Sequence, residues 1–114
     1  MKVPNIKLAI VAERKLTIYL LNPSHPVGGS KARFFLRFGF SAENWQLLAE
    51  RLRLHGVENE IVSMEPTKYG MRFAVDGLLE APDGTHLNLR TAWFISSGES
   101  NPVFVTAYPL LKNL

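Results

Sequence analysis

The sequence predicts an α+β fold of two layers, in which three N-terminal helices pack on one face of a four-stranded antiparallel β-meander. Two observations favour it. Apolar residues recur at helical spacing in the first half, whereas the second half holds four runs rich in β-branched and aromatic residues. Turn-forming residues separate those runs, and short turns join antiparallel neighbours. With 114 residues, we expect a single domain covering residues 1–114.

Each predicted helix ends at a residue that breaks helices. The first helix covers residues 12–21 and stops at Asn22-Pro23, and the second covers residues 30–38 and stops at Gly39. The third is longer. It begins after Ser41, a favoured helix-capping residue, and reaches about residue 55. His55 is then expected to supply a favourable charge near the helix C-terminus.

The four predicted strands are residues 60–65, 71–79, 86–96 and 102–108. Side chains alternate between the two faces of a strand, so the plainly apolar sets should face the helices. The open face then carries basic, hydroxyl and aromatic side chains: Arg72, His86, Asn88, Arg90, Thr106 and Tyr108. Such a surface suits phosphates and stacked bases, although an ordinary solvated sheet face also needs polar residues.

The amino-acid composition excludes several kinds of functional site. The chain has no cysteine, which excludes disulfides and sulfur-ligated metals, and its three histidines lack metal-binding spacing. We therefore expect no metal and no other cofactor. No apolar run is long enough to cross a bilayer and no secretory signal begins the chain, so a cytoplasmic protein is predicted. The 13 Lys and Arg outnumber the 10 Asp and Glu, a mild bias toward polyanionic partners.

The most informative segment is the junction between the first two predicted helices, residues 22–35. It combines His25 with groups that handle anions: two consecutive glycines, a capping serine and two cations, namely Gly28, Gly29, Ser30, Lys31 and Arg33. Phosphate is the commonest biological anion that such a corner receives. The polar loop of an ordinary helical hairpin uses the same residues, so both interpretations stay open.

RNA cleavage is a reaction that such residue types can perform without a metal, because the 2′-hydroxyl of RNA is itself the nucleophile. The protein must accept one proton, donate another, and stabilise the negative charge on the oxygens of the phosphorane-like transition state. Histidine can exchange the protons near neutral pH, and Lys and Arg can supply the positive charge. DNA lacks the internal nucleophile, which makes RNA the better substrate for a metal-free nuclease.

Several segments together resemble a known family. They are residues 19–35, Gly39-Phe40, Asn44-Trp45, Arg90-Thr91-Ala92-Trp93 and the late Val105-Thr106-Ala107-Tyr108-Pro109. The pattern resembles a small uncharacterised bacterial domain family that is found alone or attached to toxin-like proteins. That family is similar to the barnase–EndoU–colicin–RelE superfamily of metal-independent ribonucleases, which places helices before a four-stranded antiparallel sheet.

The resemblance implies an RNA-binding endoribonuclease that acts as the toxin of a toxin–antitoxin or polymorphic-toxin system, with RNA as substrate and a cognate antitoxin or immunity protein as partner. It implies a catalytic site across His25, Lys31, Arg90, Thr106 and Tyr108. His25 would act as acid or base, Lys31 and Arg90 would stabilise the phosphate, and Thr106 with Tyr108 would orient it. The sequence departs from the superfamily in having no second proton-transfer residue at a matching place; His86 and Tyr108 are the two candidates, and the choice between them stays open.

The remaining residues of the predicted site bind substrate: Gly28, Gly29, Ser30, Arg33, Arg72, His86 and Asn88. One alternative is a non-catalytic RNA- or protein-binding module, of antitoxin or immunity type, on the same scaffold. A second alternative is a structural interaction domain. It would dock through an exposed aromatic cluster, Phe34, Phe35, Phe38 and Phe40.

Overall fold

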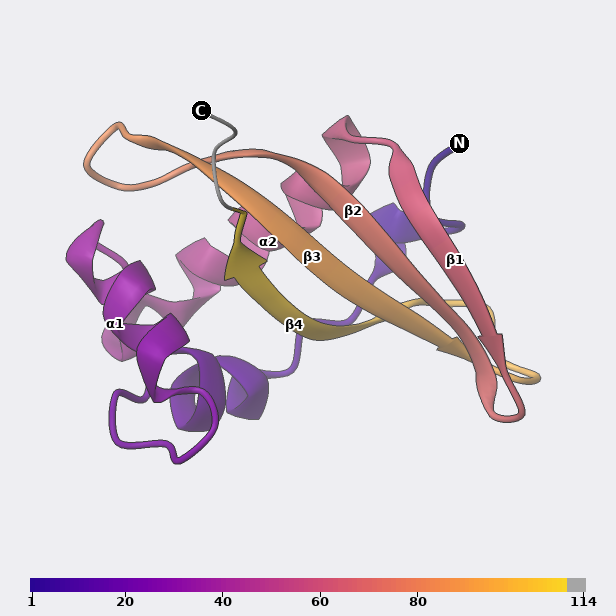
Figure 1. The fold of residues 1–114 in the computed structure, drawn as a ribbon, viewed down its shortest axis with the longest axis horizontal. Coiled ribbons are helices and arrows are strands. Elements are labelled where there is room, and N and C mark those ends of the chain that lie inside the picture. Colours follow the sequence, from indigo (N-terminus) through magenta and orange to yellow (C-terminus); the bar gives the residue numbers. More distant parts are fainter. Residues whose placement is uncertain (111–114) are drawn as a thin grey trace.

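An antiparallel sheet occupies the second half of the chain in this computed structural model, which describes residues 1–110. Its strands are β1 (Ile61–Thr67), β2 (Gly70–Glu80), β3 (His86–Ser96) and β4 (Val103–Pro109). They lie in the order β1-β2-β3-β4, so each strand pairs with its neighbour in sequence (Figure 1). Gly84 and Gly98 adopt positive φ in the two later turns, a conformation that favours glycine.

The sequence predicted three N-terminal helices packed on the sheet, and this prediction is wrong. Two α-helices of appreciable length are present among residues 1–110, α1 (Gly29–Arg37) and α2 (Trp45–Glu58), and both lie mid-chain. Short 3₁₀ and π-helical turns occur elsewhere: η1 (Ile6–Leu8), η2 (Lys15–Leu20) and η3 (Ala42–Asn44). The helix α2 crosses behind the sheet in Figure 1, whereas α1 packs on η2 and β4 at the sheet's edge.

The first predicted helix is replaced by the π-helix η2, and the reason lies in three leucines that are buried together. Leu16, Leu20 and Leu21 are all at most 3% exposed. A regular α-helix would turn Leu21 away from Leu16, five residues earlier. In η2 the N–H of Leu21 instead donates to the carbonyl of Leu16 at 2.7 Å, the bonding of a π-helix, and this wider turn directs both side chains inward.

The third predicted helix is displaced at both ends. Residues 42–44 form the 3₁₀ turn η3, and α2 proper starts at Trp45 without a side-chain cap from Ser41. At the other end α2 continues through Gly56 to Glu58. Gly56 is a packing glycine, since a Cβ there would lie 2.7 Å from the side chain of Ile6. Gly39, by contrast, does end α1 with a positive φ of 103°.

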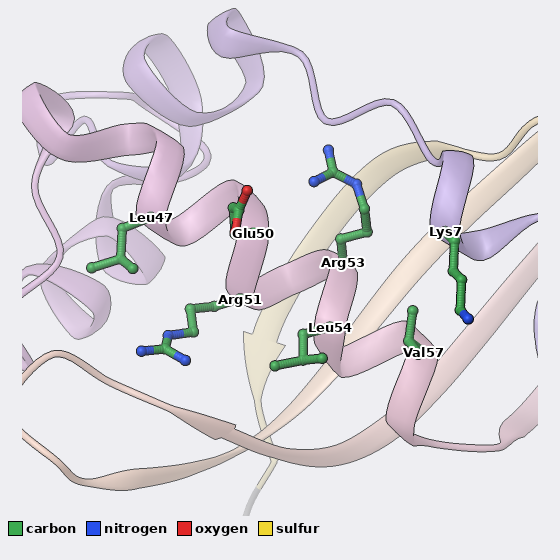
Figure 2. A pocket seen from close by; sticks show the side chains of 7 residues that line it. All are labelled: Lys7, Leu47, Glu50, Arg51, Arg53, Leu54 and Val57. Atoms are coloured by element: carbon green, nitrogen blue, oxygen red, sulfur yellow. The ribbon is translucent and has the colours of Figure 1, made fainter.

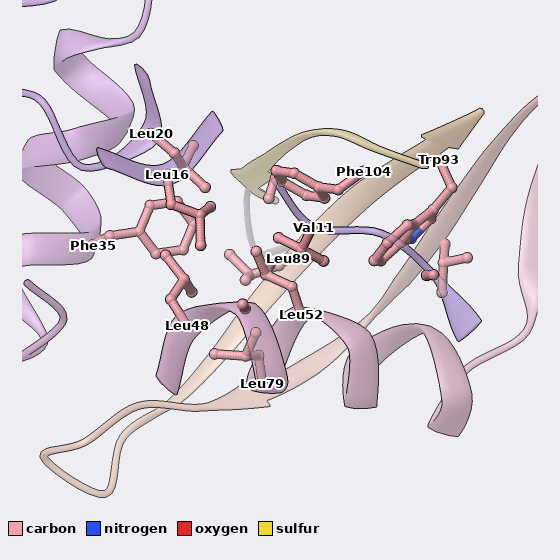
Figure 3. Close-up of a cluster of buried hydrophobic side chains, with 14 of the residues drawn as sticks. Val11, Leu16, Leu20, Phe35, Leu48, Leu52, Leu79, Leu89, Trp93 and Phe104 are labelled. Carbon is pink, nitrogen blue, oxygen red and sulfur yellow. The ribbon is translucent and has the colours of Figure 1, made fainter. Parts of the chain in front are cut away.

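The core lies between α2 and the sheet and extends to η2 and α1 (Figure 3). Its largest fully buried side chains are Trp93, Phe35 and Phe104. The aromatic cluster of α1 belongs to this core, because Phe35 and Phe40 are at most 2% exposed and Phe34 and Phe38 are half-buried against it. The interaction-domain alternative thus loses its exposed docking surface.

His55 is buried in this core and is not the surface charge that was expected. Its Nε2–H donates to the carbonyls of Gly77 at 3.0 Å and Leu89 at 3.2 Å, while its Nδ1 accepts from the hydroxyl of Thr91 at 3.0 Å. The indole of Trp93 donates to the same hydroxyl oxygen. Burial lowers the pKa of His55 more than these backbone carbonyls raise it, so the imidazole is neutral at neutral pH.

Candidate active site

Three polar side chains from three different elements meet at the edge of the sheet. The ammonium of Lys31 on α1 donates to the hydroxyl of Tyr19 on η2 at 2.7 Å and to the hydroxyl of Thr106 on β4 at 3.3 Å. The two hydroxyl oxygens lie 3.0 Å apart, which closes a triangle of hydrogen bonds. Lys31 is half-buried, so its charge is held in one place rather than moving freely in solvent.

Tyr19 is the most perturbed member of this triangle. Partial burial raises its pKa, but the hydrogen bonds with Lys31 and Thr106 and the charges of Lys31 and Lys15 together outweigh burial and lower the pKa below the usual value. The two ammonium groups also lie near the tyrosine ring, with Lys31 Nζ 5.4 Å and Lys15 Nζ 5.7 Å from its centroid. The phenolate form is therefore stabilised at this site.

His25 lies beside the triangle, with its ring edge-on to the ring of Tyr19 at a centroid distance of 5.1 Å. Its Nδ1 accepts hydrogen bonds from the backbone N–H groups of Val27 at 3.0 Å and Gly28 at 2.9 Å. Two donors aimed at Nδ1 fix the tautomer whose proton is on Nε2. In this conformation His25 presents an N–H donor, Nε2–H, to anything bound beside it.

The two glycines of the junction serve close packing. A Cβ at Gly28 would lie 2.6 Å from the ring of Tyr19, and one at Gly29 would lie 2.7 Å from the carbonyl oxygen of Pro23. The N–H of Gly28 bonds to His25, and that of Gly29 bonds to the carbonyl of His25 at 2.9 Å. Both N–H groups are thus engaged within the loop, and the glycines permit the approach that locks His25 against Tyr19.

Ser30 and Arg33 make no hydrogen bond with the triangle in the described part of the chain. Ser30 is exposed in the first turn of α1, where Gly28 holds the N-cap position without a side-chain cap. Arg33 is exposed and its guanidinium reaches the carbonyl of Pro23 at 3.4 Å.

An open groove of about 530 Å³ runs past these residues. Its walls combine cationic, aromatic and aliphatic side chains: Arg14, Lys15, Ile18, Tyr19, His25, Val105 and Thr106. Ile18 is 50% exposed there. The groove thus offers positive charge and an apolar wall beside the hydroxyl of Tyr19.

Tyr108 and Arg90 continue the site across the sheet. Lys31 Nζ lies 5.8 Å from the ring centroid of Tyr108, and Tyr108 pairs with Arg90 in the register of β4 and β3. Arg90 makes a bidentate ion pair with Asp76 on β2, with N–O distances of 2.7 and 2.9 Å. Asp76 is the main reason that the pKa of Arg90 is raised above its usual value. The carboxylate also offsets much of the charge that Arg90 could offer to a phosphate.

The structure separates the other predicted residues from the triangle. Thr106 pairs with Ala92, and six residues of β3, about 20 Å, separate Ala92 from His86. Asn88 is two residues from Arg90 in the same direction, toward His86. Arg72 is on β2, opposite Phe94. The structure therefore brings together His25, Lys31, Thr106 and Tyr108, with Arg90 beside them, and places His86 at the far end of the strand.

Sequence reasoning missed Tyr19, Lys15 and Asp76. Tyr19 falls among the leucines at an apolar position of the first predicted helix, and only its phenol oxygen distinguishes it from them. Lys15 precedes Tyr19 by four residues, the spacing that brings helical side chains together, and this signal could have been used. Asp76 could have been found only from strand register, because 14 residues separate it from Arg90.

Comparison with known proteins places the chain in a family. A family model, described as a domain of unknown function (DUF6883), matches residues 2–111. The chain belongs to the DUF6883 family. No curated protein shows significant similarity to this DUF6883 domain.

A solved structure has a similar fold. It is a contact-dependent growth inhibition toxin–immunity protein complex from Klebsiella pneumoniae 342, and one of its chains superposes on the DUF6883 domain with a TM-score of 0.69. The two chains are 17% identical, and the match covers 89% of this chain and 99% of the other. At this identity the similarity concerns the fold alone.

Two further observations concern residues 1–110. No three His, Asp or Glu side chains gather there in a group that could hold a metal ion. No helix in that range has the length and apolar character needed to cross a membrane.

Proposed function

We propose that this DUF6883 domain is a metal-independent endoribonuclease of the toxin type. The observation that carries the proposal is the triangle of Tyr19, Lys31 and Thr106, in which a phenol of lowered pKa contacts a fixed ammonium beside an open cationic groove. A nuclease that uses the 2′-hydroxyl of RNA needs a base, an acid and fixed positive charge in one place. This cluster supplies all three.

The chemistry balances within the Tyr19–Lys31 pair. The phenolate of Tyr19 takes the proton of the 2′-hydroxyl, the 2′-oxygen bonds to phosphorus, and the bond from phosphorus to the 5′-oxygen breaks. Lys31 stabilises the charge on the phosphorane and donates a proton to the departing 5′-oxygen. The products are a 2′,3′-cyclic phosphate and a 5′-hydroxyl. The 2.7 Å hydrogen bond then returns the proton from Tyr19 to Lys31.

The neighbouring residues orient the phosphate in this scheme. His25 donates from Nε2, because its Nδ1 is already occupied by two backbone donors. Thr106 holds the hydroxyl of Tyr19, and Tyr108 borders Lys31. Arg90 stabilises the phosphate from the edge of the site, and its ion pair with Asp76 offsets part of its charge. Tyr19 thus takes the proton-transfer role for which the sequence suggested His86 or Tyr108.

The comparison structure supports the toxin part of the proposal. It contains a growth inhibition toxin together with an immunity protein, and a chain of that complex shares the fold of this DUF6883 domain. A toxin acting on RNA requires a cognate antitoxin or immunity protein in the cell that makes it. We accordingly include such a protein among its partners, with RNA as substrate and the cytoplasm as the place of action.

The purified domain tests the proposal on a single-stranded RNA in the presence of EDTA. We expect products with 2′,3′-cyclic phosphate and 5′-hydroxyl ends, and no cleavage of the same sequence with 2′-O-methyl groups. Lys31→Ala should lower the cleavage rate by about 100-fold, because it removes the fixed charge and the acid. Lys68→Ala is the matched control. Lys68 also lies over a tyrosine ring, at 5.1 Å from the centroid of Tyr69, but in the β1–β2 turn.

Intact RNA with the native protein, or equal rates for both lysine variants, would contradict the nuclease. The same complex favours one second candidate, since it also contains an immunity protein. In that case the domain is a non-catalytic binding module. Native protein that leaves RNA intact and protects cells from a co-expressed growth inhibition toxin would establish this role.

A further inference from the structure

A second groove lies on the outer surface of α2, away from the triangle. It has a volume of about 450 Å³, and its lining side chains are Lys7, Leu47, Glu50, Arg51, Arg53, Leu54 and Val57 (Figure 2). A neighbouring groove along the N-terminal segment shares Lys7 and Val57 with it. We call these two together the α2 groove, and none of their lining residues lines the groove beside Tyr19. A third groove, toward β2, shares Arg51 and Leu54 with the first.

The α2 groove carries a net positive charge. Its lining includes one carboxylate, Glu50, and four cations, Lys2, Lys7, Arg51 and Arg53. Glu58 and Glu80 line the adjoining groove beside Arg51. The positions of the cations are partly fixed, because the Nε of Arg53 donates to the carbonyl of Ala9 at 3.1 Å and so ties the N-terminal segment to α2.

Arg51 has unused hydrogen-bonding capacity in this groove. Its Nε is buried and has no hydrogen-bond partner within residues 1–110. Its nearest carboxylate oxygen, on Glu80, lies 3.8 Å from NH1, beyond hydrogen-bond distance. The side chain as a whole is 31% exposed, so a carboxylate bound from outside can pair with the guanidinium without displacing a strong ion pair.

The floor between the cations is aliphatic. Leu54 is 43% exposed and Leu8 is 62% exposed, and Leu47 and Val57 are half-buried on the same side of α2 as Leu54. In Figure 2 Arg51 and Leu54 project from one side of the helix, so charge and apolar surface alternate along it. Aromatic side chains, on which bases of a nucleic acid stack, are absent from the lining of this groove.

We propose that the α2 groove binds an acidic amphipathic helix of a partner protein. Glutamates of that helix would pair with Arg51, Arg53 and Lys7, and its leucine-type side chains would cover Leu54 and Val57. From Leu47 to Val57 the groove follows α2 for about 15 Å, the length of about three turns of a bound helix. The bound partner would leave the groove beside Tyr19 open to substrate. The proposal is independent of the ribonuclease activity, because it concerns binding on a different surface.

Fluorescence anisotropy with a labelled synthetic helix tests this assignment. The probe is a peptide of about 16 residues with leucine on one face and glutamate on the other. We expect a dissociation constant in the micromolar range and at least tenfold weaker binding by Lys7→Glu, Arg51→Glu protein. That double variant keeps the Arg53 tie to Ala9. Leu54→Gln, at an exposed position, should also weaken binding without changing the net charge.

The matched control reverses two cations elsewhere, Arg37→Glu and Lys68→Glu, and has the same net charge as the groove variant. It should bind the peptide as the native protein does. Equal binding of a peptide with glutamine in place of glutamate would overturn the proposal, as would equal loss in the control variant. A single-stranded RNA that displaces the peptide from the native protein would assign the groove to nucleic acid instead. Thermal unfolding of each variant shows that the fold is retained.

Discussion

The phenol of Tyr19 has an environment unlike that of an ordinary surface tyrosine. Lys31 donates to its oxygen at 2.7 Å, and Lys15 lies near its ring at 5.7 Å from the centroid. The ring itself is held by His25 on one side and by the tight approach of Gly28. Each contact restricts the position of one oxygen atom. Such restriction is what a proton-transfer group requires, because the reacting atoms must already be aligned.

Replacing Tyr19 with phenylalanine tests this role at a single atom. We expect Tyr19→Phe to lower RNA cleavage by about 100-fold or more, since the base is lost while the ring still packs against His25. In native protein the rate should rise with pH above neutrality, because the active form is the phenolate and the pKa of Tyr19 is lowered from 10.0. Cleavage rates measured between pH 6 and 10 provide the profile.

Tyr69→Phe serves as the control, since Tyr69 also lies near a lysine but outside the candidate site. It should keep both the native rate and the native pH profile. A Tyr19→Phe protein that retains the alkaline rise would show that another group is the base.

At the scale of the elements, the strands and α1 were predictable, and the first helix, over residues 12–21, was not. Period-two alternation and turn residues placed all four strands to within two residues at each end. The difference at η2 has a physical cause: Leu16 and Leu21 are both buried, and the π-type turn between them directs both side chains inward. The pairing of Thr106 with Lys31 needed tertiary structure, because 75 residues separate them.

The contact between α2 and the sheet also contains a titratable group, which makes stability depend on pH. The pKa of His55 is lowered in the folded protein, chiefly by burial. Below its unfolded pKa of about 6.5, the unfolded chain therefore binds more protons than the folded one. We expect the free energy of unfolding to be fully retained above that pH and to fall as the pH drops from about 6.5 toward the folded pKa. The limiting slope is about 1.4 kcal/mol per pH unit.

Urea denaturation at several pH values measures this effect, with His55→Gln as the comparison. The variant should be less stable at pH 8, because glutamine fits the bonds to Gly77, Leu89 and Thr91 poorly. Its stability should change less between pH 7 and 5 than that of the native protein. Parallel pH dependences would assign the effect to other groups.

For the whole molecule, one hydrophobic cluster joins the sheet, α2 and the segments that carry the candidate site. Phe104 of β4 is fully buried against Trp93, with ring centroids 5.5 Å apart, and Thr106 lies two residues farther along the same strand. Packing of the core thus sets the position of β4. Trp93 itself is completely buried.

A pair of substitutions at neighbouring positions tests how much this core contributes. Phe104→Ala should lower the free energy of unfolding by about 3–5 kcal/mol, because it opens a cavity beside Trp93 in the core. Val103→Ala, at a residue that is 38% exposed, should cost less than about 1 kcal/mol. Denaturant midpoints of the two variants make the comparison. Similar losses would mean that the buried ring of Phe104 contributes no more to stability than an exposed neighbour does.

The close approach of Gly28 to the ring of Tyr19 has an evolutionary consequence. Any side chain at position 28 would occupy the space of that ring, since even a Cβ would lie 2.6 Å from it. The two positions should therefore vary together among DUF6883 sequences. A homologue with a larger residue at position 28 is expected to lack an aromatic residue at position 19, and such a homologue would have lost the catalytic phenol proposed for this chain.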